Sequence, residues 1–166
     1  MIKVFIDQGH NPTNPNAGAE GSGLREQDLV YDIGIRLAEL LNSDPEFEAR
    51  LSRNSPSEIL GETTAQSLRA RTDAANSWGA DIFISLHANA SPITSASGSE
   101  GLVYKIPSAA YTLSEDILTE LSLATGLQAR GTTARPGLYV LRKTTMPAVL
   151  VELGFITNAG DAALMR

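Results

Sequence analysis

The chain has 166 residues, of which 42% are hydrophobic and 19% charged, a composition typical of one globular domain. Its formal net charge of −6, without any run of lysine or arginine, argues against nucleic acid as a partner. The absence of cysteine excludes disulfides and thiolate nucleophiles, so a metal ion would need nitrogen and oxygen ligands.

The first elements along the chain are a strand, a long loop and a helix. A short apolar run at residues 2–6 predicts a buried strand, and the stretch rich in asparagine, proline and glycine at residues 9–23 predicts an irregular loop. Long ordered loops usually have a function, so we expect this one to shape a site. Apolar residues then recur at three- and four-residue spacing in residues 25–41, which predicts a helix with one buried face.

Strands and helices continue to alternate along the rest of the chain. Further strands are predicted at residues 47–52, 81–86, 100–105, 139–141 and 148–151. Further helices are predicted at 64–78, with Gly79 as the C-cap, and at 108–123. A last helix begins at Asp161, and we expect it to be incomplete. This order predicts a single α/β domain over residues 1–166, in which helices cover both faces of a central, mostly parallel, twisted sheet of about six strands.

Four polar residues lie where such a sheet would gather a ligand. The two histidines, His10 and His87, each follow an apolar strand, Glu26 opens the first helix, and Glu152 ends the last apolar run. In open α/β sheets, ligands bind beyond the carboxyl ends of the strands. Two histidines and one carboxylate are an established ligand set for catalytic zinc, so we expect His10, Glu26 and His87 to hold one zinc ion.

A hydrolytic zinc centre also needs a group that takes a proton from water and delivers it to the leaving amine. Glu152 fits this role because it follows four apolar residues, where an unpaired carboxylate would be costly without a function. Taken singly, either histidine would more often be a hydrogen-bonded loop residue, and Glu26 a solvated glutamate of a first helical turn. The combination of the four favours a metal centre.

Other polar residues are weaker candidates. Asn89 follows His87 closely and either donates to a substrate carbonyl or forms a turn. Arg130 and Arg142 are candidates for binding an anionic group of the substrate, whereas Arg69 and Arg71 are expected to form structural salt bridges. The sequence has no glycine-rich nucleotide-binding motif and no G-x-S-x-G motif, which argues against nucleotide binding and serine hydrolysis.

Several segments carry a resemblance to a known family. They include VFIDQGH at residues 4–10, AGA at 17–19, LRE at 24–26, LR at 68–69, AN at 75–76, ADIFISLHANA at 80–90, RG at 130–131, VLR at 140–142 and MPAVLVELGF at 146–155. Together they resemble the zinc-dependent N-acetylmuramoyl-L-alanine amidases, peptidoglycan hydrolases that include bacterial cell-wall amidases and phage endolysins. The chain departs from the family at Gln8 and Asn11, where proline and glycine are usual, and the family normally closes with a full C-terminal helix.

The resemblance implies that His10, Glu26 and His87 hold zinc, that Glu152 is the catalytic glutamate, and that the scissile bond joins N-acetylmuramic acid to L-alanine of the stem peptide. It implies a monomer that acts on peptidoglycan outside the cell, either secreted or released at phage lysis, although the sequence has no recognisable leader or membrane span. A wall-binding module or an activator would be supplied by another segment or chain.

Two other functions remain open. The same centre would serve a zinc peptidase or carboxypeptidase that cuts the stem peptide itself. A wall-binding module that keeps the fold but has lost turnover would also retain these residues.

Overall fold

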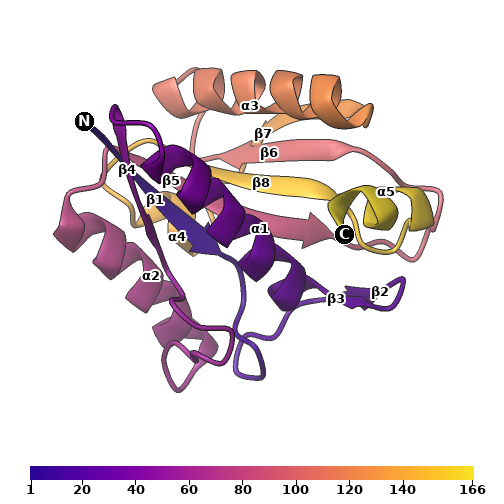
Figure 1. Cartoon of the computed structure of the whole chain (residues 1–166), viewed down its shortest axis with the longest axis horizontal. Coiled ribbons are helices and arrows are strands. Elements are labelled where there is room, and N and C mark those ends of the chain that lie inside the picture. The colour runs from indigo at the N-terminus through magenta and orange to yellow at the C-terminus, as the bar shows by residue number, and fades with distance from the viewer.

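Six strands form the central sheet of the computed structural model, which describes residues 1–166 (Figure 1). Their order across the sheet is β4 (Phe47–Leu51), β1 (Ile2–Gln8), β5 (Ile82–Asn89), β8 (Ala148–Phe155), β6 (Ser99–Val103) and β7 (Ala129–Ala134). Every neighbouring pair is parallel except β6 and β8, which confirms the predicted α/β fold with a mostly parallel sheet.

Helices cover both faces of this sheet. On one face, α1 (Glu26–Asn42) packs over β1 and β5, and α3 (Ala109–Thr125) packs over β6 and β8. On the other face, α2 (Thr64–Trp78) and α4 (Tyr139–Arg142) pack against the stacked rings of Phe5 and Phe83. Because β5 alternates between the faces, Ile84 and Leu86 lie under α1 while His87 lies on the opposite face.

The last helix, α5 (Ala159–Met165), begins two residues before the predicted start because the Asn158 side chain caps it. Its buried residue Asp161 accepts hydrogen bonds from the backbone N–H groups of Phe155 and Gly98. The helix is thereby joined to the end of β8 and to the loop that precedes β6. None of the helices combines the length and apolar character that a membrane crossing requires.

The structure corrects three of the predicted elements and adds a strand that was not predicted. Residues 139–141 form the short helix α4 rather than a strand, since three apolar residues do not distinguish the two periodicities. The edge strand β7 was not predicted because its sequence, ARGTTA, has no apolar alternation. β5 extends to Asn89, so His87 lies within it rather than beyond it. The predicted irregular loop contains a small antiparallel hairpin of β2 (Glu20–Gly21) and β3 (Leu24–Arg25).

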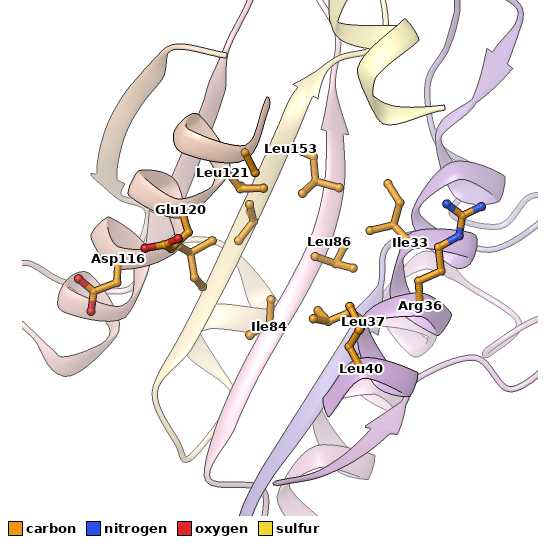
Figure 2. A pocket seen from close by; sticks show the side chains of 13 residues that line it. Ile33, Arg36, Leu37, Leu40, Ile84, Leu86, Asp116, Glu120, Leu121 and Leu153 are labelled. Carbon is orange, nitrogen blue, oxygen red and sulfur yellow. The ribbon is translucent and has the colours of Figure 1, made fainter. Parts of the chain in front are cut away.

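An apolar groove of about 630 Å³ lies between α1 and α3 (Figure 2). Figure 2 shows Leu37 and Leu40 of α1 on one side, Leu121 of α3 on the other, and Ile84 and Leu86 of β5 between them. These two β5 side chains lie on the face opposite His87, so the groove is on the other side of the sheet from the candidate site.

Candidate metal centre

His10, Glu26 and His87 meet at the carboxyl ends of β1 and β5, as predicted. One ligand atom from each residue lies within 4.8 Å of the other two. Glu26 Oε1 lies 3.1 Å from His10 Nε2 and 3.2 Å from His87 Nδ1, and the two imidazole rings are 5.0 Å apart in an edge-to-face arrangement. The three side chains therefore form a group that could hold a metal ion.

Glu26 is oriented by backbone groups from two other segments. Its Oε1 accepts a hydrogen bond from Ala88 N at 3.0 Å, and its Oε2 accepts one from Ala19 N at 2.9 Å. Burial alone would raise the pKa of Glu26, but hydrogen bonds from His10 and His87 outweigh it and lower the pKa below its usual value. The carboxylate is therefore kept in the ionised form that a metal ligand needs.

His87 is held by a chain of buried side chains that ends at Arg71. The Ser85 hydroxyl donates to Asp7 Oδ2 at 2.7 Å, and Arg71 Nη1 donates to Asp7 Oδ1 at 2.8 Å. Because Ser85 uses its only proton on Asp7, its oxygen accepts from His87 Nε2 at 3.0 Å. Nε2 therefore carries a proton, and the lone pair of Nδ1 in the neutral ring points toward Glu26.

This arrangement requires positive charge between His87 Nδ1 and Glu26 Oε1. Two acceptors at 3.2 Å repel each other unless a proton or a cation lies between them. Burial alone would lower the pKa of His87, but the hydrogen bond to Glu26 outweighs it and raises the pKa, so a proton serves this purpose in the metal-free protein. A divalent ion bound by nitrogen and oxygen atoms would replace that proton.

His10 is held mainly through its backbone. It has a left-handed conformation with φ 69°, and its carbonyl oxygen accepts from Arg71 Nη2 at 2.7 Å. The preceding Gly9 packs against the other imidazole, since a Cβ there would lie 2.5 Å from His87 Cε1. His10 Nδ1 is buried without a hydrogen-bond partner in the protein, so the His10 ring is less firmly oriented than the His87 ring.

Glu152 lies directly beside the ligand group. It pairs in register with His87 on β5 and with Glu100 on β6. Burial raises the pKa of Glu152 to about 7, with a further contribution from the Glu26 and Glu100 carboxylates and an opposing one from the histidines. Its Oε2 is buried and makes no hydrogen bond to the protein. A carboxyl group with these properties exchanges a proton near neutral pH.

The three residues predicted to contact substrate occupy different places. Asn89 ends β5, and its amide donates to Glu100 Oε1 at 2.6 Å. Arg130 lies on β7, with its Nε 3.9 Å from Glu100 Oε2. Arg142 lies in α4 near Pro147 and Ala148, at the amino end of β8, so the structure does not bring it to the rim that carries Glu152.

Sequence reasoning missed the groups that support the ligands. It correctly predicted a salt bridge for Arg71, but not that the partner would be Asp7 or that the pair would hold His87 through Ser85. Asp7 had a recognisable pattern, because it is a carboxylate next to an apolar strand, as Glu152 is. Glu100 has no comparable pattern, because it follows a loop rich in serine.

The two departures from the family pattern are both buried. Gln8 accepts a hydrogen bond from Arg53 N at 2.9 Å, and its amide donates to the Tyr31 carbonyl. Asn11 donates to the Pro15 and Leu60 carbonyls and so links the first loop to the segment before α2. Neither side chain replaces a candidate metal ligand.

Known proteins share the sequence and the fold of this chain. A family profile described as N-acetylmuramoyl-L-alanine amidase matches residues 4–166. The chain is 38% identical over 168 residues to N-acetylmuramoyl-L-alanine amidase CwlM of Bacillus licheniformis, covering 100% of this chain and 61% of that protein. It is 34% identical over 174 residues to the endolysin of Bacillus phage SPP1, covering 98% of this chain and 58% of the endolysin. The chain thus spans about three-fifths of the length of these curated relatives.

A solved structure gives the same result for the fold. The catalytic domain of CwlV, an N-acetylmuramoyl-L-alanine amidase from Bacillus (Paenibacillus) polymyxa var. colistinus, superimposes with a TM-score of 0.84 at 30% identity. The match covers 99% of this chain and 87% of that one. The similarity therefore extends over the whole sheet and its rim.

Proposed function

Because the chain belongs to the N-acetylmuramoyl-L-alanine amidase family, we propose that residues 1–166 act as a catalytic domain that hydrolyses the amide bond between N-acetylmuramic acid and L-alanine in peptidoglycan. The observation that carries this proposal is the placement of Glu152 in register beside His87, one member of the His10, Glu26 and His87 group. Its site of action is the cell wall, which fits relatives described as amidases and as an endolysin.

Zinc is the ion we propose for the three-residue group. Two imidazole nitrogens and one carboxylate oxygen match a catalytic zinc site with an open position. When bound, zinc would polarise the scissile carbonyl and make water more acidic. His87 would bind through Nδ1, because Ser85 holds the proton on Nε2, and His10 would bind through Nε2, which faces Glu26.

Glu152 would act as the general base and then as the general acid of the hydrolysis. Burial raises the pKa of Glu152 to about 7 in the metal-free protein. Such a carboxylate would accept a proton from the attacking water and then donate it to the amine of L-alanine. Its register position opposite His87, one strand spacing of about 5 Å away, supports a role beside the ion, and Glu152 does not belong to the His10, Glu26 and His87 group.

Replacement of Glu152 by glutamine tests this assignment. The variant should bind zinc as the parent does and should lose about 10²–10⁴-fold in hydrolysis, the usual contribution of a general acid–base group. The control is Glu120→Gln, because Glu120 lines the groove on the opposite face of the sheet. Purified peptidoglycan is digested with and without a chelator, and the products are analysed by mass spectrometry. This measures whether hydrolysis needs a metal ion, which bond is cleaved and how fast it is cleaved.

The products separate the alternatives. Free muramic acid carboxyl groups and stem peptides with a new N-terminal alanine support the amidase. Released amino acids from within the stem would instead assign a peptidase, and zinc-dependent binding without any cleavage would assign a wall-binding module. Full activity of the Glu152→Gln variant would rule out the proton-transfer role, and loss of zinc in that variant would make Glu152 a ligand.

A further inference from the structure

A row of polar side chains continues from the metal centre across three more strands. His87 on β5 pairs with Glu152 on β8, and Glu152 pairs with Glu100 on β6. The next strand, β7, places Arg130 and Gly131 opposite Glu100, between the register pairs Ser99 with Ala129 and Gly101 with Thr132. The row therefore runs from the candidate ligands toward the edge of the sheet and ends at a positive charge.

Two irregularities in the sheet lie along this row. Between Glu152 and Phe155, β8 has one more residue than the β5 segment opposite it. Between Ala129 and Thr132, β7 likewise has one more residue than β6, and Gly131 adopts a φ of 93° there. Extra residues of this kind turn side chains out of the regular alternation and are common next to active sites.

The guanidinium group of Arg130 is held from three sides. It lies over the Phe155 ring at 5.0 Å, its Nη1 donates to the Ser97 carbonyl at 3.2 Å, and its Nε faces Glu100 at 3.9 Å. Its aliphatic part lies against Gly98, where a Cβ would approach Arg130 Cγ to 3.0 Å. The side chain is nonetheless 41% exposed, and its Nη2 makes no hydrogen bond to the protein.

Glu100 orients Arg130 without saturating it. One carboxylate oxygen accepts the short bond from Asn89, and the other lies too far from Arg130 Nε for a hydrogen bond. The guanidinium group therefore has a fixed plane and free donors, which is the arrangement that binds a carboxylate through two parallel hydrogen bonds.

We propose that Arg130, positioned by Glu100 and Phe155, binds the α-carboxylate of the second residue of the stem peptide. This inference rests on the proposed amidase function. That residue is a D-glutamate joined through its γ-carboxyl, so its α-carboxyl is either free or amidated. Glu152 on β8 and Arg130 on β7 are two strand spacings apart, about 10 Å. Two extended peptide residues cover about 7 Å of this distance, and the long arginine side chain covers the rest.

The proposal predicts that the enzyme distinguishes a carboxylate from a carboxamide at this position. The test compares two substrates of the zinc-loaded enzyme. N-acetylmuramoyl-L-Ala-D-Glu-L-Lys has the free α-carboxylate, and N-acetylmuramoyl-L-Ala-D-isoglutamine-L-Lys has the carboxamide in its place. The parent chain should show a kcat/KM about tenfold higher for the free acid, the usual effect of a charge-assisted hydrogen bond. The preference should fall to about one in Arg130→Gln and stay intermediate in Arg130→Lys, which keeps the charge but not the planar fork.

The matched control is Arg135→Gln, which removes an exposed arginine just beyond the other end of β7 and should keep the tenfold preference. Equal rates on both substrates in the parent chain, or an equal loss on both in Arg130→Gln, would overturn the subsite and leave the amidase proposal intact. Cleavage of neither substrate, nor of whole peptidoglycan, would remove the amidase proposal and this inference with it.

Discussion

The two halves of the rim differ in how firmly the protein holds them. On the half formed by β1 and β5, the two histidines are connected to the Asp7–Arg71 ion pair, whose side chains are 2% and 1% exposed. On the half formed by β8, β6 and β7, Glu152 has an unpartnered oxygen and Arg130 is 41% exposed beside a loosely paired Glu100. The β1–β5 half is thus anchored in the interior of the fold, whereas the β8–β6–β7 half makes fewer bonds to the protein and becomes exposed toward Arg130.

The difference predicts that changes on the two halves have different consequences. Substitutions on the β1–β5 half should reduce both the free energy of unfolding and the affinity for metal. Substitutions on the β8–β6–β7 half should change the reaction with little loss of stability, as expected for Glu152→Gln and Arg130→Gln.

Replacement of Arg71 by methionine should have the largest effect on stability. It would leave the buried Asp7 carboxylate without its counter-charge and remove the donor to the His10 carbonyl. Breaking a buried ion pair in this way costs about 3–5 kcal/mol. Urea denaturation of the metal-free protein measures the loss, with Arg69→Met as the control, because its bridge to Asp73 is exposed and worth about 0–1 kcal/mol. Similar losses in the two variants would contradict the contrast between the halves.

Replacement of Ser85 by alanine should mainly weaken the binding of zinc. It removes the acceptor that fixes the proton on His87 Nε2, and loss of such outer partners typically weakens metal binding by about 10–100-fold. Competition with a chromophoric chelator measures the zinc dissociation constant. Ser114→Ala is the matched control, since Ser114 is equally buried but lies on α3 and bonds to Thr132. Unchanged zinc affinity in Ser85→Ala would show that the Ser85 hydroxyl does not set the tautomer.

The smallest effect concerns the pH dependence of the metal-free protein. Glu152 ionises near its ordinary pKa of 4.5 when unfolded but only at about 7 when folded, so the folded state binds the extra proton between these values. Stability should therefore fall as pH rises from about 4.5 to 7, by about 1–3 kcal/mol. The raised pKa of His87 acts in the same direction above its ordinary value of 6.5.

The contribution of Glu152 is isolated by subtraction. Chemical denaturation of the parent and of Glu152→Gln at pH 5 and at pH 7, both without metal, gives the difference that belongs to this carboxyl. The variant should gain stability relative to the parent at the higher pH. A pH-independent difference would mean that burial does not penalise the Glu152 carboxylate.

The sequence predicted the parts of the molecule that depend on local patterns. The bounds of α2 were predicted to the residue, because Gly79 and the periodicity of 64–78 define both ends, and the convergence of His10, Glu26 and His87 followed from strand polarity. The edge strand β7 and the short helix α4 were missed, because an exposed strand needs no apolar alternation and one helical turn shows no period. The roles of Ser85 and Glu100 depend on register between strands distant in sequence, which no local pattern carries.

The hydrogen bonds of Glu26 have a consequence for redesign. Its carboxylate joins the amides of Ala19 and Ala88, so it closes the first loop over the site besides facing both histidines. An exchange of Glu26 for histidine or cysteine, aimed at a different metal, would release that loop. His10, whose Nδ1 has no hydrogen-bond partner in the protein, is the candidate ligand that can be exchanged without breaking a side-chain hydrogen bond that holds this loop.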